Sequence, residues 1–496
     1  MKRLKRLIPF LLIIMVFLGG CSPNSQTTTA ESTAEAVTET TAVLSAVVSP
    51  TSTVVVDPEF TDRDLETSYD DATAVQVTLD GGTIQVSGDG ATASNGVLTI
   101  TKEGTYVVTG NLSDGQIVVA AADTDKIQIV LSGATINCSD NAPIYVKSAD
   151  KVFITLAANT VNTLTDGGAY VQTDENTVDG VIFSKADLTI NGEGTLNITT
   201  DVNHGIVSKD DLVITGGIIN IASANDGLNG KNCVKIKDGL ISINSSDGKG
   251  ITSKNADDST KGHVYIAGGT ITISNSFEGI EGTVIIVEGG TVDITAEDDG
   301  FNGSNAMTSA NDTGGRGGAM ENDANVYVSI AGGTIHVNAS GDGLDSNGNL
   351  YISGGTIYVS GPTSNGDGAL DYNGTADVSG GTVVIAGSTG MAQSFSETST
   401  QVSLLYNLTS SCAAGTEIKL TDDSGKTVVT YTPDKTYQSV VISSPDLAQG
   451  STYTLTCGSQ TVEIPLTGVV ISNGQTGMGE PGQGGQSQPG QSGQRP

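Results

Sequence analysis

Several residue types that mark common functional classes are scarce in this sequence. It has no tryptophan and only 8 phenylalanines in 496 residues, which argues against a sugar-binding platform of tryptophan rings. Lys and Arg total 22 against 55 Asp and Glu, so the formal charge is -33. Nucleic-acid binding needs clustered positive charge, and we exclude it on this ground. The negative charge points to bound cations or to a solvated acidic surface.

Sites built on nitrogen and sulfur ligands are also disfavoured. The histidines, His204, His263 and His336, and the four cysteines beyond Cys21 show no zinc-ligand spacing. Residues 342–348 (DGLDSNG) have the wrong offsets for an EF-hand loop and no closing glutamate. The leucine and asparagine pattern of leucine-rich repeats is absent as well.

A repeat of alternating apolar residues is present instead. Residues 264–302 contain one unit twice, with Gly-Gly-Thr at positions 268–270 and 289–291, 21 residues apart. Alternation predicts strands, and a Gly pair allows a sharp backbone corner. We expect Val264 and Ile271 to point inward and Tyr265 and Thr272 outward.

The same unit extends in both directions along the chain. Because one unit cannot bury its apolar side alone, the units must stack. We therefore predict an all-β fold, a parallel β-helix whose less regular terminal rungs cap the stack. The corners that precede β-branched runs are Gly216-Gly217, Asp238-Gly239, Gly268-Gly269, Gly289-Gly290, Gly332-Gly333, Gly354-Gly355 and Gly380-Gly381.

The N-terminus predicts export and lipid attachment. Residues 1–20 combine a basic start with an apolar run too short to span a membrane comfortably, as in a signal peptide. Leu18-Gly19-Gly20-Cys21 resembles a bacterial lipobox, which implies that Cys21 carries lipid and anchors the protein to the membrane on the extracytoplasmic side. We interpret residues 21–60, rich in Ser, Thr and Ala, as a flexible linker.

The rest of the chain divides into three parts. We assign residues 61–395 to the β-helix, with a projecting loop at 303–323. Short strands at roughly ten-residue spacing predict a small antiparallel, sandwich-like domain at 396–472. Its Cys412 and Cys457 either form a disulfide or remain free thiols. Residues 473–496, rich in Gly, Gln and Pro, are expected to be disordered.

The corner that follows the second strand of each unit is acidic, and a second column of oxygen-bearing residues follows it. Stacked rungs lie about 4.8 Å apart, so equivalent carboxylates would repel unless a cation or proton intervenes. A hard cation with oxygen ligands fits, and we predict Ca²⁺; alternatively, each Asp-Gly is simple turn chemistry. The predicted ligands are Glu278, Glu281, Asp298, Asp299, Asn302, Asp342 and Asp345, with Asp226, Asp367 and Asp371 as further candidates.

Two further columns are candidates for substrate binding. Lysines recur at rung spacing and either bind an acidic polymer or offset nearby acids. Tyrosines recur in VYI, VYV and LYI and either lie against sugar rings or pack on one another. The two sets are Lys185, Lys209, Lys231 and Lys254, and Tyr265, Tyr327 and Tyr351.

Several segments, above all FEGIEG and DGLDSNG, resemble a bacterial family of carbohydrate-binding-domain proteins. The resemblance covers about residues 80–470. These are secreted calcium-binding parallel β-helices, distantly similar to family 9 pectate lyases. The resemblance implies a right-handed helix, calcium on the acidic corners, and binding of plant cell-wall polymers such as cellulose or polygalacturonate without cleavage.

Three functions follow from these patterns. The first is a lipid-anchored, non-catalytic polysaccharide-binding protein on the cell surface, with calcium either structural or bridging to uronates. The second is a calcium-dependent polysaccharide lyase in which Lys209, Lys231 or Lys254 removes a proton. The third is a structural spacer or adhesin in which calcium fastens the rungs.

Overall fold

The computed structural model describes residues 52–168, 170–306 and 322–474. The predicted signal peptide, Cys21, the linker up to residue 51, most of the 303–323 loop and the tail from residue 475 lie outside the described residues. The chain divides into two units, Met1–Ala46 and Val47–Pro496, and every described residue belongs to the second.

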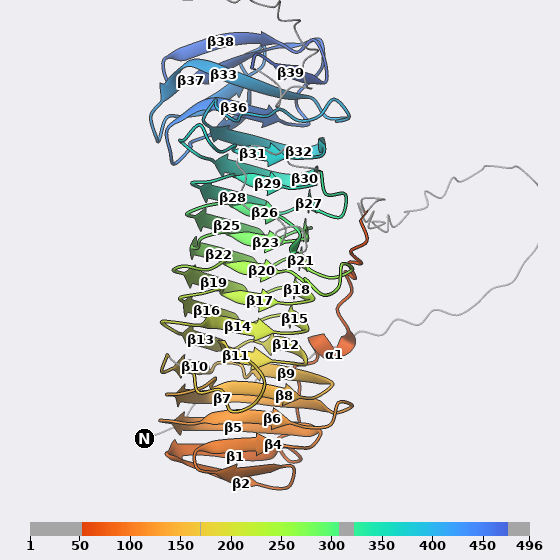
Figure 1. Ribbon diagram of the computed structural model, residues 1–496. Helices are drawn as coiled ribbons and strands as arrows, with labels where there is room; N and C mark the ends of the chain where they lie inside the picture. The colour runs from red at the N-terminus through yellow and green to blue at the C-terminus, as the bar shows by residue number, and fades with distance from the viewer. Residues whose placement is uncertain (1–51, 169, 307–321, 475–496) are drawn as a thin grey trace, which may run out of the picture. The chain divides into compact units, whose positions relative to one another are not determined.

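The predicted parallel β-helix is confirmed. Its rungs stack one on another, and each complete rung contributes a strand to three parallel ladders (Figure 1). The first ladder holds short strands. In stacking order they are β4 (Val97–Ile100), β6 (Gln116–Ala120), β8 (Ile144–Ser148), β11 (Gly180–Ser184), β14 (His204–Ser208), β17 (Leu228–Gly230), β20 (Ile251–Ser253), β23 (Ile280–Gly282), β26 (Phe301–Gly303), β29 (Leu344–Ser346) and β31 (Leu370–Tyr372).

The second and third ladders meet at the glycine corners. Four long strands run through this corner and belong to both ladders: β5 (Gly104–Leu112), β7 (Lys126–Cys138), β30 (Asn349–Ser360) and β32 (Ala376–Gly387). The second ladder also contains β9 (Lys151–Leu156), β12 (Asp187–Gly192), β15 (Asp211–Ile214), β18 (Cys233–Ile236), β21 (His263–Ile266), β24 (Val284–Val287) and β27 (Tyr327–Ile330). The third also contains β10 (Val161–Asp166), β13 (Thr195–Thr199), β16 (Ile218–Ser223), β19 (Leu240–Ser245), β22 (Thr270–Asn275), β25 (Thr291–Ala296) and β28 (Thr334–Ala339).

The corners and the core follow the sequence pattern. Gly269 and Gly290 have φ values of 86° and 85°, a region that residues with a Cβ rarely adopt. Val264 and Ile271 are fully buried, as predicted. Their counterparts in neighbouring rungs are buried too, so the inward positions form continuous apolar columns along the stack. Each rung thus buries its apolar side against the rungs above and below.

The N-terminal end of the stack is closed by antiparallel pairs. β1 (Val75–Gly81) pairs with β2 (Thr83–Ser87), and β3 (Ala91–Ser94) pairs with β4, both antiparallel. β1 also pairs in parallel with β5, so this hairpin covers the last open strand edge of its ladder. An unpaired edge would invite association with another chain.

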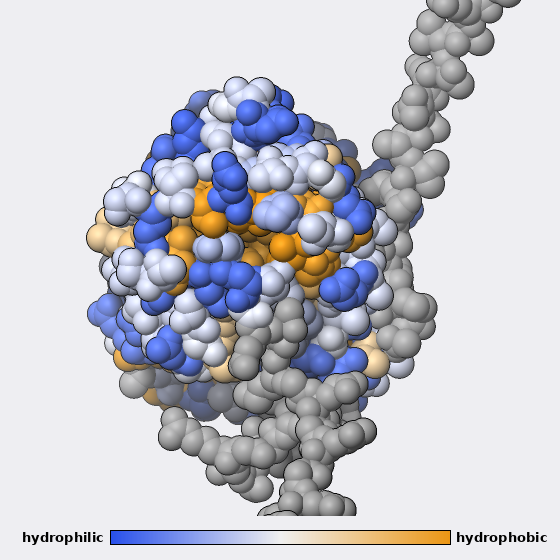
Figure 2. Space-filling model, turned by 90° about the horizontal axis from the view of Figure 1, so that it is seen from above, coloured by the Kyte–Doolittle hydropathy of each residue, from blue (hydrophilic) through white to orange (hydrophobic). Residues whose placement is uncertain are grey.

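The last rung continues into antiparallel strands. β36 (Tyr437–Ser443) pairs antiparallel with β32 and with β33 (Ser403–Cys412), whereas β33 pairs in parallel with β39 (Val470–Ser472). A second sheet contains β35 (Thr427–Tyr431), β34 (Ile418–Thr421), β37 (Thr452–Cys457) and β38 (Gln460–Pro465) in that order. Seen from this end, apolar residues gather inside a hydrophilic rim (Figure 2). Cys412 and Cys457 are buried free thiols, so the disulfide alternative is not realised.

Residues 52–66 lie along the outside of the second ladder, and we call them the N-terminal strap. Residues 52–60, which were predicted to belong to the flexible linker, are therefore part of this ordered segment. Val54 is buried against Val284 and Tyr327, and the backbone N–H of Val55 donates to the carbonyl of Thr260 at 3.1 Å. Apolar side chains and backbone hydrogen bonds hold this segment in place, which the Ser, Thr and Ala composition did not indicate.

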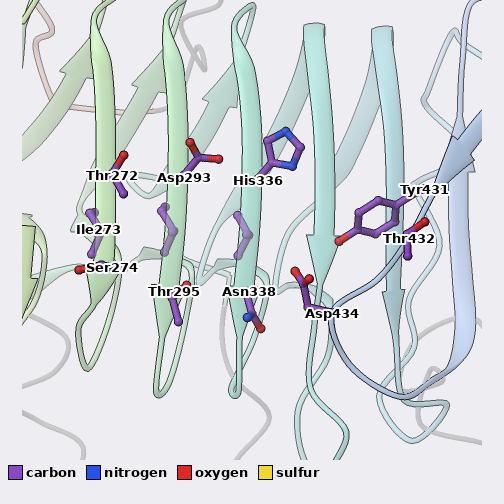
Figure 3. Close-up of a pocket in the computed structure, with 12 residues that line it drawn as sticks. Thr272, Ile273, Ser274, Asp293, Thr295, His336, Asn338, Tyr431, Thr432 and Asp434 are labelled. Atoms are coloured by element: carbon purple, nitrogen blue, oxygen red, sulfur yellow. The ribbon is translucent and has the colours of Figure 1, made fainter. Parts of the chain in front are cut away.

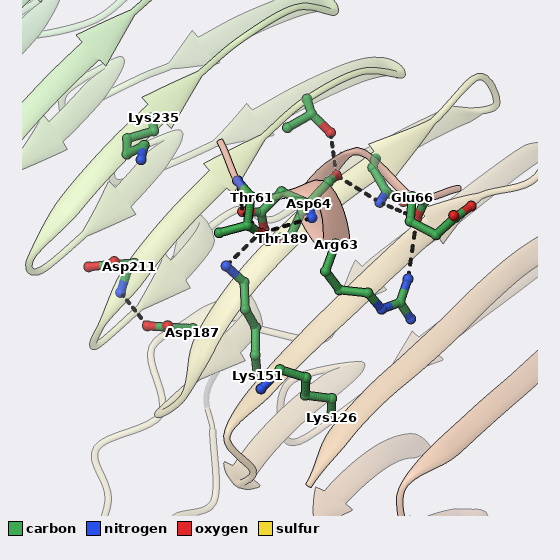
Figure 4. A network of polar contacts seen from close by, with 12 residues as sticks. Thr61, Arg63, Asp64, Glu66, Lys126, Lys151, Asp187, Thr189, Asp211 and Lys235 are labelled. Atoms are coloured by element: carbon green, nitrogen blue, oxygen red, sulfur yellow. Dashed lines mark hydrogen bonds and ion pairs between the residues drawn. The ribbon is translucent and has the colours of Figure 1, made fainter. Parts of the chain in front are cut away.

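The strap ends in a single helical turn, α1 (Asp62–Leu65). Asp64 is buried there, 2.8 Å from Lys151 Nζ, and accepts a hydrogen bond from the Thr189 hydroxyl at 2.5 Å (Figure 4). Burial raises the pKa of Asp64, but the lysine and the hydroxyl hydrogen bonds outweigh it and hold this pKa below its usual value. Among the described residues, no helix has the length and apolar character to cross a membrane.

Candidate metal centre

Two columns of side chains run along the outer side of the first ladder. One is the corner position, which precedes the glycine that leads into each strand. The other is the central residue of each three-residue strand, where Glu281 on β23 is in register with Asn302 on β26, and Asn302 with Asp345 on β29. Side chains one rung apart in such a ladder lie about 4.8 Å apart. The strand pairing therefore aligns residues that are up to 43 positions apart in the sequence, such as Asn302 and Asp345.

In the first part of the stack the corner column holds three different residue types. Its members there are His204, Asp226 and Lys249, each followed by glycine. His204 Nδ1 accepts a hydrogen bond from the backbone N–H of Asp226 at 3.0 Å and lies 3.1 Å from an Asp226 carboxylate oxygen. The backbone N–H of Lys249 donates to Asp226 at 2.9 Å. Burial raises the pKa of Asp226, but the hydrogen bond from His204 and its charge bring it below the ordinary value. In this half of the column the carboxylate of Asp226 therefore has partners within the protein.

In the next rungs the same column is entirely acidic. Glu278, Asp298 and Asp299 offer carboxylate oxygens within 4.8 Å of one another, and Asp299, Asp342 and Asp345 form a second such group. Asp299 belongs to both, so five carboxylates are contiguous. We call these five residues the acidic cluster. All five are among the calcium ligands predicted from the sequence.

The carboxyl groups of the acidic cluster resist ionisation without a cation. Burial, reinforced by Asp342, raises the pKa of Asp299 to about 8. Burial also raises the pKa of Glu278 and of Asp342 to about 7, with Glu281 and Asp371 respectively adding to the effect. The pKa of Asp345 is raised well above its usual value by burial and by Asp299. Each pKa is shifted in the direction expected for carboxylates that are shielded from water and repel one another.

Two buried oxygens at the cluster provide an independent test of whether a cation fits. Glu278 Oε2 and Asn302 Oδ1 have no hydrogen-bond partner within the described part of the chain. The Asn302 amide nitrogen donates to the other Glu278 oxygen at 3.1 Å. Buried oxygens without partners are costly in a folded protein. A hard cation takes six to eight oxygen ligands from carboxylates and amides, so these residues fit calcium.

Four other predicted ligands do not join the acidic cluster, and each has another partner. Glu281 is held by two lysines, with Lys254 Nζ at 2.7 Å and Lys249 Nζ at 3.4 Å. Asp226 pairs with His204, as described. The remaining two accept side-chain hydrogen bonds, Asp367 from Ser364 and Asp371 from Gln393.

The predicted lysine column pairs with acids of the protein. Lys209 Nζ lies 3.4 Å from Asp179, Lys231 contacts Asp257, and Lys254 contacts Glu281. Lys185 is exposed. The alternative in which these lysines offset nearby acids is therefore the one that the structure favours for three of the four.

The predicted tyrosine platform is covered by the N-terminal strap. Tyr265 is only 3% exposed and lies under Phe60, with ring centroids 6.2 Å apart. Tyr327 is fully buried against Val54 and packs on Tyr351 at 6.2 Å. Tyr327 also lies two positions away from the column of the other two, because the register pairs Ser329 with Tyr351. Tyr265 and Tyr327 are therefore buried within the protein, and Tyr351 is half-buried against Tyr327.

The sequence interpretation missed two features. The corner column includes His204 and Lys249, which the shared X-Gly pattern could have revealed. A further acidic group, Asp187, Asp210 and Asp211, lies on the second ladder with oxygens within 4.8 Å of one another. Burial, Asp211 and Asp210 raise the pKa of Asp187 to about 6. The Asp210-Asp211 pair was visible in the sequence, but its alignment with Asp187 depends on the register of β12 and β15.

Comparisons with known proteins found a family model, a curated relative and a solved structure. A family model described as "Carbohydrate-binding domain-containing protein" matches residues 94–369, more than half of the chain. A curated relative with the same description, from Acetivibrio thermocellus, is 40% identical over 135 residues, which are 27% of this chain and 47% of the relative. The chain thus spans about half the length of the curated relative that it matches. A solved structure described as the "polysaccharide lyase-like protein from C. thermocellum, Gadolinium derivative" is 26% identical, with a TM-score of 0.43, and covers 62% of this chain and 97% of that one.

Proposed function

The chain belongs to the family of carbohydrate-binding domain-containing proteins, and from this premise we propose that it is a calcium-binding, non-catalytic polysaccharide-binding protein. The acidic cluster would hold Ca²⁺ through Glu278, Asp298, Asp299, Asp342 and Asp345, with Asn302 as a further oxygen donor. The ion would fasten successive rungs and supply a positive charge for uronate groups of an acidic polymer such as polygalacturonate.

The observation that carries this proposal is the change of charge along one column. His204 and Lys249 accompany Asp226 in the first part of the stack, whereas Glu278, Asp299 and Asp342 follow one another with no cationic residue between them at the corner. A protein that only needed turns at this corner would gain nothing from gathering half-buried carboxylates. A bound dication explains both the cluster and its two partnerless oxygens.

The lysines near the cluster support binding over cleavage. A lyase needs a lysine whose pKa is lowered so that it can accept a proton. Burial lowers the pKa of Lys249, but Glu281, Glu278 and Asp226 outweigh burial and raise it above the ordinary value. Lys254 is engaged by Glu281 and by the Ser304 hydroxyl at 3.1 Å. Neither lysine is placed as a free base.

The location proposed for the protein rests on its N-terminus. A signal peptide at residues 1–20 and a lipidated Cys21 would attach the chain to the extracytoplasmic side of the membrane, with the residues up to the strap as tether. A surface position would give a polysaccharide-binding module access to polymers that cannot enter the cell.

The test is retention of the protein on immobilised polygalacturonate with calcium and with EDTA. We expect calcium-dependent retention, lost in Asp345→Asn and kept in Asp247→Asn, which removes an exposed acid outside the cluster. Retention that is unaffected by EDTA would contradict a role of calcium in bridging the protein to uronate groups. Unsaturated product absorbing in the ultraviolet would identify a lyase, and failure to bind any glycan would leave the structural-spacer function.

A further inference from the structure

A groove of about 610 Å³ lies on the third ladder, a different ladder from the one that carries the acidic cluster. Its floor is the outer side of β22, β25 and β28, and its wall is the segment Tyr431–Asp434 of the C-terminal domain (Figure 3). The two parts are about 100 residues apart in the sequence, so neither forms a groove alone. No sequence pattern had marked this place.

The floor presents one outward position from each of several rungs. The register aligns Thr272 with Asp293, Asp293 with His336, and His336 with Tyr358. Figure 3 shows Thr272, Asp293 and His336 projecting from successive strands in one row. Rungs repeat about every 4.8 Å, a spacing close to the length of one sugar residue in an extended polysaccharide. The row therefore offers one contact per sugar along the stack.

The wall is fixed in place by hydrogen bonds to the rungs. The hydroxyl groups of Tyr431 and Ser360 are 2.7 Å apart, and the backbone N–H of Asp434 donates to the Ser360 hydroxyl at 2.8 Å. Lys435 Nζ donates to the Ala339 carbonyl. A wall held at three points keeps the groove open before a ligand arrives, which reduces the entropy lost on binding.

An aromatic stack closes one end of the floor. The Tyr358 ring stacks on Tyr431 with centroids 4.9 Å apart and an interplanar angle of 23°. The His336 ring lies 5.2 Å from Tyr358 on the other side. His336 is exposed and Tyr358 is half-buried, so the stack offers both apolar ring surface and a polar edge to a ligand.

The chemistry of the lining selects a neutral sugar. Asp293 and Asp434 are acceptors for sugar hydroxyls, while Thr272, Thr295 and Asn338 donate and accept. Neither lysine nor arginine occurs among the described residues that line the groove. The nearby Lys435 in the wall is engaged by the Ala339 carbonyl, so the two carboxylates of the lining disfavour a uronate. Vicinal hydroxyl groups on an uncharged ring can satisfy them.

We propose that this groove binds a neutral polysaccharide chain, laid along the stack over Thr272, Asp293 and His336 and bordered by Tyr431 and Asp434. The proposal rests on the polysaccharide-binding function proposed above and adds a second, calcium-independent site to it. The C-terminal domain then has a function, because it supplies the wall of this site.

The experiment is calorimetric titration of the protein, with calcium and with EDTA, using cellohexaose as the neutral probe and hexagalacturonate as the acidic one. We expect cellohexaose to bind equally in both conditions. His336→Ala and Asp293→Ala should each weaken that binding about tenfold, because each removes a groove contact without opening the core. Asp247→Asn, which removes an exposed acid outside the groove, is the control.

The outcomes separate the two proposals. The proposal of a groove site is overturned if both groove variants bind cellohexaose as the wild type does, or if EDTA abolishes cellohexaose binding. If only hexagalacturonate binds, and only with calcium, the proposal of a groove site is also overturned, but the proposed role of the acidic cluster stands. Asp345→Asn should abolish the calcium-dependent signal and spare cellohexaose. Binding of neither probe overturns both.

Discussion

The backbone N–H of Asp342 donates to Asp299 Oδ1 at 2.7 Å, across one rung of the stack. The next rung repeats the contact, because the N–H of Gly368 donates to Asp342 Oδ1. These two corner carboxylates are thus each held by the rung that follows. The same bonds that order the corner bring Asp299 and Asp342 close enough to repel, so the backbone enforces an electrostatic cost that a cation would relieve.

Calcium is expected to raise the thermal stability of the protein. If the acidic cluster binds calcium in the folded state only, a calcium concentration of 100 times Kd adds about 2.7 kcal/mol to the free energy of unfolding. The measurement is a melting curve with excess calcium and with EDTA. Superimposable curves, from protein shown to contain metal before chelation, would contradict a rung-fastening ion.

Asp299→Asn should change stability in opposite directions with and without calcium. In EDTA the substitution removes like-charge repulsion, so the free energy of unfolding should stay equal or rise by about 1 kcal/mol. With calcium it removes a ligand, and most of the gain from the ion should be lost. Chemical unfolding in both conditions measures this, with Asp247→Asn as the neutral control. A loss of stability in EDTA would indicate that Asp299 serves the fold without a metal.

His263 should make stability depend on pH. It is 5% exposed, and burial lowers its pKa to about 4, with Asp211 opposing and Lys235, Lys261 and Asp57 also acting on it. Above pH 6.5 the side chain is neutral in both states and has no effect. Between pH 6.5 and pH 4 the unfolded chain binds a proton that the folded chain lacks, so stability falls, by up to about 3 kcal/mol.

The measurement for this prediction is urea unfolding from pH 7 to pH 4 in the wild type and in His263→Gln. The variant should lose less stability over this range, because it has no proton to bind. His336→Gln, at the exposed histidine, should follow the wild type. If the free energy of unfolding falls equally with decreasing pH in the wild type and in His263→Gln, the carboxyl groups alone govern stability between pH 7 and pH 4.

The N-terminal strap should depend on Asp64. Asp64→Ala leaves Lys151 without its partner 2.8 Å away, in a site where the lysine side chain is 14% exposed. Removing one member of a buried ion pair costs about 3–5 kcal/mol. We expect a matching loss in unfolding free energy, or release of the strap detected as faster proteolysis before residue 66. The double variant Asp64→Ala/Lys151→Met should recover part of the loss, and exposed Asp62→Asn should have little effect.

Much of the fold could be predicted from local pattern. The alternation at Val264 and Ile271 and the glycine corners follow from backbone geometry and burial, so they can be read along the chain. The strap could not, because Val54 and Phe60 sit in a segment without periodicity and contact rungs about 200 residues away. For the same reason the sequence could not decide between the two roles left open for the tyrosines: parity placed Tyr265 outward but could not show that the strap covers it.

The sequence by itself determined that units of just over 20 residues must coil and stack, since no unit can bury its own apolar side. It also determined that acids recur at one corner. Only the tertiary structure decided which acids meet. Strand register places the carboxylates of Asp299, Asp342 and Asp345 close together. It also places Asp226 beside His204, and Glu281 beside two lysines. Register is set by hydrogen bonds between distant strands, and charge balance at each rung depends on neighbours that sequence spacing alone does not identify.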